Sequence, residues 1–497
     1  MVPPLSAIIK QKQKTGDRDL TEIPRKTKPL EIISTIFFYY AVIIVPLYME
    51  NRYFNILEAK WHAYLGSIVL LVIALVFVAT KPRENPFCPQ NTLDWLVIAF
   101  ALNATISSLL SEGPRASFLG LDGWHVGALT TATLAIWYFI LLGNLRLSAN
   151  SWLAVMAVNV PITVLAMLQA MRLDIFSLHA DSNPHEYHMY ISTLGNGNWI
   201  VGYLSLLFPL FLGFYLNCDD RISERIHAAF LFVLCMLMVL TGSDGMYIAV
   251  GVMAFGLIPY AFRNPSRAQK LMLVVIMYGI CLMMVAFLPA FVGKRGSMRR
   301  LAGFFLRPYI AFGILLIGIA AYLALKKIKS TERLIRIGRN VEIALTVIVV
   351  VISAHALSFF DAFWGTGRAW TWGKSLEKYR AFPLREKMCG VGPEMLRERY
   401  TDISEFFGKP LTVSHSEPLQ VLLTMGAIGI LIWVAICVFI IYRFIKTRAW
   451  TKESCIYYLP LFAYMGQAAV NSASTLNVLL LTIIIVLFRQ NVDNVDM

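Results

Sequence analysis

Arginine side chains gather in one long polar stretch of this chain, residues 359–418, which also contains one histidine. The stretch holds Arg368 and Arg385 and, just before the chain becomes apolar again, His415 and Glu417. Guanidinium groups bind phosphate oxygens through paired hydrogen bonds, and an imidazole with a pKa of about 6.5 exchanges protons at neutral pH. These residue types therefore indicate chemistry on an anionic substrate.

Simpler interpretations exist for each of these residues. A histidine at a loop-to-helix junction can cap the helix or anchor it at a membrane interface, and Glu417 suits the positive end of the next helix. Arginines can contact anionic lipid headgroups or neighbouring carboxylates. The aromatic residues nearby can stack on sugar faces, but an interfacial aromatic belt explains them equally well. They are Trp364, Trp370, Trp372, Tyr379 and Tyr400.

The composition is typical of a multi-spanning membrane protein. Of the 497 residues, 58% are hydrophobic and 15% are charged, and the mean hydropathy is +0.63. These values lie outside the range of ordinary soluble domains. We interpret the net charge of +14 as loop charge that sets membrane orientation, so we expect a lipid bilayer and no nucleic acid as partner.

Apolar segments of about 17 to 25 residues can cross a bilayer as helices, because hydrocarbon tolerates only internally paired backbone groups. The pattern predicts an all-α polytopic membrane protein of about 12 to 14 transmembrane helices, with one large external loop between two late spans. The expected spans are residues 31–49, 62–80, 94–111, 125–143, 150–171, 199–217, 226–242, 246–263, 270–292, 308–325, 341–358, 418–442, 455–470 and 475–488. The run 455–488 is interrupted by Asn471, Ser472 and Ser474, so it is either two crossings or one crossing and a re-entrant segment.

Lysine and arginine in short loops stay in the cytoplasm, which predicts the orientation of the chain. The basic tail of residues 1–30 is expected inside, 31–358 form the first eleven spans, 359–417 form the large external loop, and 418–497 form the C-terminal spans. We expect a cell-membrane protein with a cytoplasmic N-terminus and an active face that is external or periplasmic. The segments predicted to lie on that face are 112–124, 172–198, 293–307 and 359–417.

A second group of basic residues lies in the external segment 293–307, where the charge rule disfavours them. Their clustering indicates an anionic ligand, because guanidinium groups match phosphate oxygens. The group consists of Lys294, Arg295, Arg299, Arg300 and Arg307.

Neither cysteines nor histidines indicate a metal site. The 7 cysteines contain no CxxC pair. His179, His185 and His188 follow no common ligand spacing, so scattered surface histidines are the favoured interpretation. We expect no metal and no cofactor.

Four motifs follow one another along the chain: GNGNWIVGYLSLLFPL (195–210), GRAWTWGKSL from Gly367, FPLREKMCGVGP (382–393) and HSEPLQVLLTMG (415–426). In this order they resemble the O-antigen ligase and polymerase superfamily. The first is similar to that family's glycine-asparagine entry into a membrane helix, and the second to the start of its large external loop. The third resembles its Gly-x-Gly step, and the fourth its histidine followed by a helix glycine. The resemblance covers the chain from about Asp94 onward.

The resemblance implies a membrane glycosyltransferase that needs no metal. Such an enzyme moves a glycan from a polyprenyl-diphosphate carrier to a lipid- or glycan-linked acceptor on the external face, in polysaccharide biosynthesis of the cell envelope. His415 is then the expected base for the acceptor hydroxyl, Glu417 the alternative base, and Arg368 the best candidate for the diphosphate. Further expected binding residues are Arg385, Asn198, Asp244 and the basic group at 293–307.

The chain departs from the family pattern at two places. Asp244, in TGSDGMY, and His125, in GLDGWHVGAL, stand where the family commonly has basic residues. These changes affect the expected substrate more than the reaction. Asp244 can pair with an arginine or contact the acceptor, and simple turn chemistry is the plainer interpretation.

Local details of the polar stretch complete the expectations. Gly390 and Gly392 permit a tight turn, Gly426 permits close helix approach, and 393–407 is predicted to form an amphipathic helix that acts as a lid or acceptor platform. Ligase and polymerase share the same donor chemistry and remain alternatives. A transporter or flippase of lipid-linked saccharide is a further alternative, although transporters place polar groups near the midplane and show repeated halves. A purely structural membrane component leaves the arginine clustering unexplained.

Overall fold

The protein, described from a computed structural model, is built almost entirely from helices. Within the described part of the chain the only strands are β1 (Tyr190–Ile191) and β2 (Gly195–Asn196), which form an antiparallel pair. The structure describes residues 29–80, 86–120, 124–180, 190–292, 301–358, 364–400, 412–446 and 452–492.

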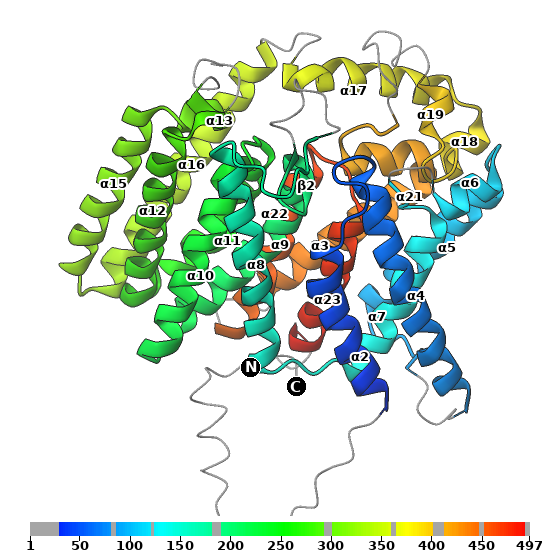
Figure 1. Ribbon diagram of the computed structural model, residues 1–497, viewed down its shortest axis with the longest axis horizontal. Helices are drawn as coiled ribbons and strands as arrows, with labels where there is room; N and C mark the ends of the chain where they lie inside the picture. The colour runs from blue at the N-terminus through cyan, green and yellow to red at the C-terminus, as the bar shows by residue number, and fades with distance from the viewer. Residues whose placement is uncertain are drawn as a thin grey trace, which may run out of the picture.

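Long apolar helices run side by side and form a bundle (Figure 1). They are α2 (Pro29–Tyr39), continued by η1 (Tyr40–Ile44) and α3 (Val45–Leu47), then α4 (Ile56–Thr80), α5 (Thr92–Leu109), α7 (Ala128–Asn144), α8 (Ala149–Ala170), α9 (Gly197–Asn217), α10 (Arg221–Leu240), α11 (Gly245–Ala261), α12 (Pro265–Ala286), α15 (Pro308–Lys326), α16 (Thr331–Ser358), α21 (Glu417–Lys446), α22 (Lys452–Ala468) and α23 (Thr475–Val492). Nine spans within the described residues are long and apolar enough to cross a membrane. The chain is therefore an all-α, multi-pass membrane protein.

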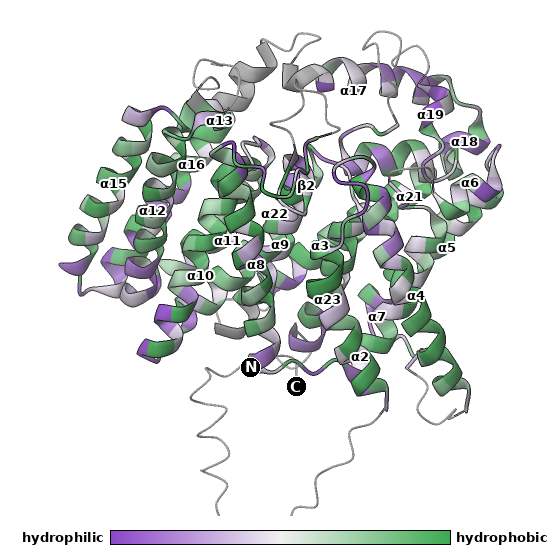
Figure 2. Cartoon of the chain, viewed as in Figure 1, coloured by the Kyte–Doolittle hydropathy of each residue, from purple (hydrophilic) through white to green (hydrophobic). Residues whose placement is uncertain are grey.

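Every predicted span overlaps one of these helices. The ambiguous run 455–488 forms two separate helices, α22 and α23, and α23 is one of the shorter apolar helices of the described chain. The hydropathy colouring agrees, with apolar residues along the bundle helices and polar residues gathered on α17 to α19 and at the opposite helix ends (Figure 2). The apolar length of each segment was enough to locate these helices, because each one satisfies its own backbone hydrogen bonds.

The bundle has two different ends. Helix α17 (Trp364–Ala381) lies across one end, together with the short helices α18 (Leu384–Cys389) and α19 (Leu396–Arg399) (Figure 1). We call this end the cap face. Helix α2 begins and α23 ends at the opposite end, which we call the terminal face. The remaining short helices, α6 (Pro114–Leu119), α13 (Pro289–Val292) and α14 (Leu301–Phe305), belong to connections on the cap face.

Several helices that begin at the terminal face start with a side-chain cap. Asn91 accepts a hydrogen bond from the backbone N–H of Asp94 in α5, Asp220 accepts from Ser223 in α10, and Asn264 accepts from Ser266 in α12. Each cap satisfies a backbone donor that the first turn of a helix leaves open. The polar residues between the apolar runs therefore define where these spans begin.

Helix α9 is the centre of the bundle. Every residue from 200 to 216 is buried, and α9 packs against α22, α10, α11 and α23. A helix that is apolar on all sides is expected in such a central position. Helix α15 lies at one edge and exposes Tyr309, Phe312 and Ile317, as expected for a lipid-facing surface.

A buried ion pair ties three helices together near the terminal face. The Asp94 carboxylate in α5 accepts hydrogen bonds from Nε and Nη2 of Arg489 in α23 at 3.1 and 3.2 Å, and from the Tyr138 hydroxyl in α7 at 2.6 Å. Both charged side chains are almost fully buried. Because a buried charge is costly without its partner, this contact joins the N-terminal and C-terminal parts of the bundle.

Helix α21 is broken at Gly426, which has φ 72° and ψ −170°. The backbone carbonyl of Leu423 accepts from Val391 N at 3.1 Å, and that of Thr424 accepts from Gly392 N at 2.9 Å. Side chains of α5 bind the same turn, with Asn103 Nδ2 donating to Met425 O at 3.0 Å and Ser107 Oγ to Thr424 O at 2.6 Å. The polar backbone groups exposed by the break are thus satisfied by the loop after α18 and by α5.

Gly390 and Gly426 lie where the loop after α18 crosses α21, and at both positions a side chain would collide with backbone. A Cβ at Gly390 would lie 2.2 Å from the backbone of Thr424, and a Cβ at Gly426 would lie 2.2 Å from Met388 O. Both glycines also have positive φ, which side chains disfavour. Gly426 therefore permits close approach, as expected, and in addition ends the outer half of the helix.

The predicted amphipathic helix over 393–407 is wrong in its described part. Between 393 and 400 only Leu396–Arg399 is helical, and 401–411 lie outside the described residues. Glu394 has φ 60°, a left-handed conformation that a continuing right-handed helix excludes. The long helix of the polar stretch is instead α17, whose sequence has no marked apolar periodicity.

Candidate active site

One face of α17 points toward the bundle and carries Arg368, Trp372 and Ser375, spaced about one and two helical turns apart. Arg368 Nη2 donates to Asn471 Oδ1 at 3.3 Å, and Trp372 Nε1 donates to the backbone oxygen of Ser414 at 2.9 Å. The guanidinium group of Arg368 therefore lies one helical turn from Trp372, which binds the loop that carries His415. Sequence analysis predicted one site between Arg368 and His415, and α17 contacts both of the loops that border it through Arg368 and Trp372.

Asn471 lies in the loop between α22 and α23, where buried polar side chains gather. Its amide Nδ2 also donates to Gln467 Oε1 at 3.4 Å. The buried polar atoms around it that have no hydrogen-bond partner in the described structure are Gln467 Nε2, Ser472 Oγ, Ser474 Oγ, Thr475 Oγ1, Asn477 Oδ1 and Asn477 Nδ2. Buried polar groups are nearly always paired with protein, water or ligand, so this cluster indicates a binding region.

The N-termini of α9, α11 and α23 meet beside this loop. A Cβ at Gly245, the first residue of α11, would lie 2.7 Å from Asn471 Nδ2, and a Cβ at Gly202 in α9 would lie 2.1 Å from Asn477 Nδ2. Glycine at these positions permits the close approach. Helix N-termini carry partial positive charge and open backbone N–H donors. Together with Arg368 they make this region favourable for an anion.

A second set of contacts links this region to the His415 loop. Ser243 Oγ donates to Asn198 Oδ1 at 2.6 Å. The ring of Trp199 lies edge-on to that of Trp124 with centroids 6.0 Å apart, and Trp124 Nε1 donates to Thr412 Oγ1 at 3.0 Å. The two sets of contacts close a ring, which we call the cap-face cluster. Its members are Arg368, Asn471, Ser243, Asn198, Trp199, Trp124 and residues 412–415.

His415 has a left-handed backbone conformation with φ 54°. The flanking residues hold it there, since Ser414 N donates to Gln420 Oε1 at 2.9 Å and Ser414 Oγ to Ser416 O at 2.9 Å. The histidine side chain is half-buried, whereas Ser414 and Ser416 are buried. A non-glycine residue held in this conformation by its surroundings is a frequent mark of a functional position.

Glu417 is engaged elsewhere in the outer half of α21. Its Oε1 accepts from Trp433 Nε1 at 3.2 Å and its Oε2 from the Tyr464 hydroxyl at 3.0 Å. Trp433 lies beyond the break at Gly426, so the carboxylate connects both halves of α21 to α22. With both oxygens accepting hydrogen bonds, this geometry favours a positioning role over the predicted alternative role as base.

The structure separates Arg385 from Arg368. Arg385 is in α18, beyond the far end of α17, and the helix from Arg368 to Ala381 rises by roughly 20 Å. Its side chain is 57% exposed and lies 3.8 Å from Glu386. Arg385 therefore does not join the cap-face cluster. The sequence did not reveal this separation, because it did not show that the intervening residues form one long helix.

Asp244 borders the cluster through its neighbours Ser243 and Gly245. Its Oδ1 accepts from the backbone N–H of Ala302 at 2.9 Å, in α14. This contact holds the end of the segment whose basic group was predicted to bind an anion. Of that group only Arg307 is described, and its Nη1 donates to the Tyr309 hydroxyl at 2.9 Å. Lys294, Arg295, Arg299 and Arg300 lie outside the described residues.

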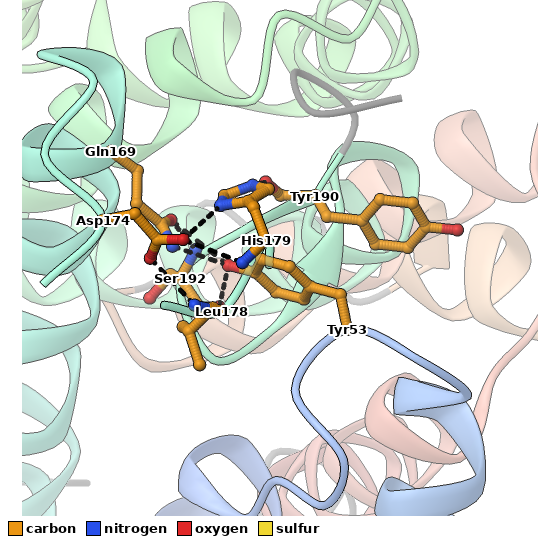
Figure 3. Close-up of polar contacts among 7 residues, drawn as sticks. All are labelled: Tyr53, Gln169, Asp174, Leu178, His179, Tyr190 and Ser192. Atoms are coloured by element: carbon orange, nitrogen blue, oxygen red, sulfur yellow. Dashed lines mark hydrogen bonds and ion pairs between the residues drawn. The ribbon is translucent and has the colours of Figure 1, made fainter. Parts of the chain in front are cut away.

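His179, in the loop between α8 and α9, binds other residues of that loop (Figure 3). His179 Nδ1 lies 3.2 Å from Asp174 Oδ2, and its Nε2 lies 2.9 Å from the backbone oxygen of Tyr190. Both ring nitrogens thus fasten the loop, and His185 and His188 lie outside the described residues. Burial raises the pKa of Asp174, but the backbone N–H groups of His179 and Leu178 outweigh it and hold the pKa below its usual value. Among the described residues no group of three or more His, Cys, Asp or Glu side chains is arranged to hold a metal ion.

Sequence reasoning missed much of the cap-face cluster. Asn471 and the serines after it were recognised only as a polar interruption between spans, and Trp124 and Trp199 were not singled out. The available signal was the polarity of NSAST within an apolar run, because such groups need partners.

No known protein-family model matches this chain, and no curated protein matches it.

Proposed function

We propose that this chain is a membrane glycosyltransferase of the O-antigen ligase type. It takes a glycan from a polyprenyl-diphosphate carrier and transfers it to a lipid- or glycan-linked acceptor on the external face of the cell membrane. A polysaccharide polymerase of the same kind is the alternative, since the two differ in acceptor and not in donor chemistry.

The position of Arg368 is the observation that carries this proposal. Its guanidinium group binds Asn471 beside the unpartnered buried hydroxyl and amide groups at the start of α23. A diphosphate offers acceptor oxygens to all these donors and to the helix N-termini. Arginine beside a helix N-terminus is a combination that stabilises negative charge as it develops on a leaving diphosphate.

His415 is proposed as the base for the acceptor hydroxyl. The hydroxyl oxygen forms a bond to the anomeric carbon, the bond from that carbon to the phosphate oxygen breaks, and the hydroxyl proton passes to the imidazole. The electron pair of the broken bond remains on the diphosphate, where Arg368 compensates the additional negative charge. The aromatic rings of Trp124, Trp199 and Trp372 are suited to line the glycan, since sugars stack on aromatic faces.

A carrier for lipid-linked saccharide is favoured by one feature only, the break in α21, because transporters use discontinuous helices. In this protein the backbone groups exposed by the break are already bound by Val391, Gly392 and the α5 side chains of Asn103 and Ser107. They are therefore not available to a transported solute. The polar cluster also lies at one end of the bundle.

The proposal is tested with purified protein, a polyprenyl-diphosphate-linked glycan and candidate acceptors. Arg368→Ala is expected to lower the transfer rate by at least about 10²-fold, because a charge-stabilising donor is lost. Arg380→Ala is the matched control, since Arg380 is an exposed arginine of the same helix. EDTA is expected to leave the rate unchanged. Transport of the donor without a new glycosidic bond, or full activity of Arg368→Ala, would contradict the proposal.

A further inference from the structure

Carboxylates and histidines alternate in a chain at the start of α4. Glu50 Oε2 lies 2.7 Å from His62 Nδ1, His62 Nε2 lies 3.7 Å from Glu58 Oε1, and Glu58 Oε2 lies 2.8 Å from His125 Nε2. We call these four side chains the acid-histidine chain. It joins the loop before α4, the first turns of α4 and the loop before α7, and none of its members belongs to the cap-face cluster.

The acid-histidine chain runs from the surface into the protein. The exposed fractions of its side chains are 33% for Glu50, 43% for His62, 27% for Glu58 and 9% for His125. Only the link between His62 and Glu58 is longer than a hydrogen bond, and the exposure of His62 lets water bridge it. Every member can gain and lose a proton, so the four groups form a continuous acid-base path.

The inner end of the path is an oriented imidazole. Glu58 holds His125 Nε2, and the ring stacks on Trp61 with centroids 4.8 Å apart and planes 3° apart. His125 Nδ1 is buried and has no hydrogen-bond partner in the described structure. A carboxylate that fixes one ring nitrogen while the other remains open is the arrangement that prepares a histidine for proton transfer.

The backbone on both sides of His125 is held by segments of the cap face. His125 has φ 51° and directly follows Trp124, which binds Thr412, three residues before His415. The carboxylate of Glu394, from the GVGPE loop, accepts the N–H of Val126 on the other side. The two neighbours of His125 are thus fixed by the segments that border His415 and the break in α21.

Other charged and titratable groups lie close to the acid-histidine chain. Lys60 is buried, and its Nζ donates to the backbone oxygens of Pro46 and Tyr48 at 2.9 and 2.7 Å. Glu394 faces the backbone beside His125, and the Tyr48 hydroxyl donates to Glu50. The hydrogen bonds from Tyr48 and from His62 hold the pKa of Glu50 below its usual value. The outer carboxylate therefore readily releases to water a proton that it takes up from His62.

We propose that the acid-histidine chain conducts the proton released by glycan transfer from the site to the external solvent. This inference rests on the proposed function, in which each new glycosidic bond releases the acceptor's hydroxyl proton. The proton leaves the His415 imidazole and is accepted by His125 at Nδ1, and His125 releases one from Nε2 to Glu58. Glu58 passes it to His62, and His62 passes it from Nδ1 to Glu50 and water. No oxidant or further reactant is required.

The first test compares transfer rates in dilute buffer and in buffer with added imidazole, a diffusible proton carrier. His62→Gln is expected to lower kcat by about tenfold in dilute buffer, with KM unchanged, and imidazole restores the rate. Glu58→Gln is expected to lower kcat by about 10²-fold without rescue, because His125 is not accessible to the added buffer. His227→Gln, the same substitution in α10 near the terminal face, is the control and leaves the rate unchanged.

A wild-type rate of His62→Gln in dilute buffer, or a loss that imidazole does not restore, would overturn the proposal in favour of a structural network. Trp61 fluorescence gives a second readout that needs no transfer activity, since a protonated imidazole quenches an indole stacked on it. The pH titration of the wild type, with that of Trp61→Phe subtracted, is expected to shift to lower pH in Glu58→Gln. If wild-type protein transfers no glycan, the proposed function fails. The titration then still decides whether Glu58 and His125 exchange protons, and superimposed curves refute it.

Discussion

Single side chains of α17 connect parts of the chain that lie far apart in sequence. Arg368 reaches the loop between α22 and α23, and Trp372 reaches the loop before α21. Their spacing of four residues places both on one helical face. The proposed site therefore depends on the direction of a few side chains as much as on their chemical types.

Substitutions of His415 can distinguish the role of its imidazole from the effect of its strained backbone conformation. A non-glycine residue in the left-handed conformation costs roughly 1 to 2 kcal/mol, which glycine avoids. His415→Gly is expected to unfold at a higher temperature than the wild type and to lose glycan transfer, whereas His415→Ala keeps the backbone strain, unfolds near the wild-type temperature and also loses transfer. Thermal unfolding in detergent and the transfer assay measure the two effects. Retained transfer in His415→Gly would exclude His415 as the base.

Asp174 predicts a pH-dependent stability of the loop before α9. Its pKa is lower in the folded protein than in the unfolded chain, so its stabilising contribution is present above the unfolded pKa and disappears as pH falls through the folded pKa. Asp174→Asn is expected to cost about 1 to 2 kcal/mol at neutral pH and little once the pH has fallen below the folded pKa of Asp174, where the wild type has lost the contribution too. Thermal unfolding of both proteins across pH measures the difference. A constant difference at all pH values would contradict this assignment.

At the scale of elements, the cap-face structure depends on a backbone-to-backbone crossing. The loop after α18 donates two N–H groups to the carbonyls of α21 just before Gly426. This crossing fixes the outer half of α21, and hence the loop with His415 that precedes it. A helix that ran straight through Gly426 would carry its first turn, and His415 with it, away from α17.

Gly426→Ala is expected to destabilise the protein by several kcal/mol, since its Cβ would overlap the Met388 carbonyl and its φ is positive. Gly373→Ala is the matched control, because Gly373 lies in α17 with no atom within 4 Å of an added Cβ. The control is expected to gain about 0.5 to 1 kcal/mol from helix propensity. Thermal unfolding in detergent compares the two. Equal unfolding temperatures for both variants would show that the crossing is not required.

At the scale of the whole molecule, the two ends of the bundle differ in kind. The terminal face is fastened by the buried pair of Asp94 and Arg489, both of which are satisfied within the protein. The cap face holds the unpartnered polar groups beside Asn471 and the helix that covers them. The proposed orientation, with the cap face outside, follows from the basic loops and makes the cluster accessible to an extracytoplasmic acceptor.

Cysteine labelling in intact cells tests this orientation. Cys88 is exposed in the connection between α4 and α5 at the terminal face, and Glu377 is an exposed residue of α17. A membrane-impermeant maleimide is expected to label Glu377→Cys in intact cells and Cys88 only after the membrane is permeabilised. A Cys389→Ser background removes the partly accessible thiol of α18. Labelling of Cys88 alone in intact cells would establish the opposite orientation.

The sequence by itself determined the membrane class, the positions of the spans and the two regions that hold Arg368 and His415. Apolar length is sufficient for the spans, because a helix in hydrocarbon must satisfy its own backbone and cannot borrow partners from water. Polar residues at the ends of those spans were visible for the same reason. Each of these features is local.

The tertiary structure decided which of these residues meet. Arg368 and Asn471 are 103 residues apart in sequence, and no local pattern joins them. Likewise only the packing of α17 separates Arg385 from Arg368, and only the break in α21 turns Glu417 toward Trp433. Contacts between elements depend on how helices cross and where they end, and these are set by the fit of side chains and glycines across the whole bundle.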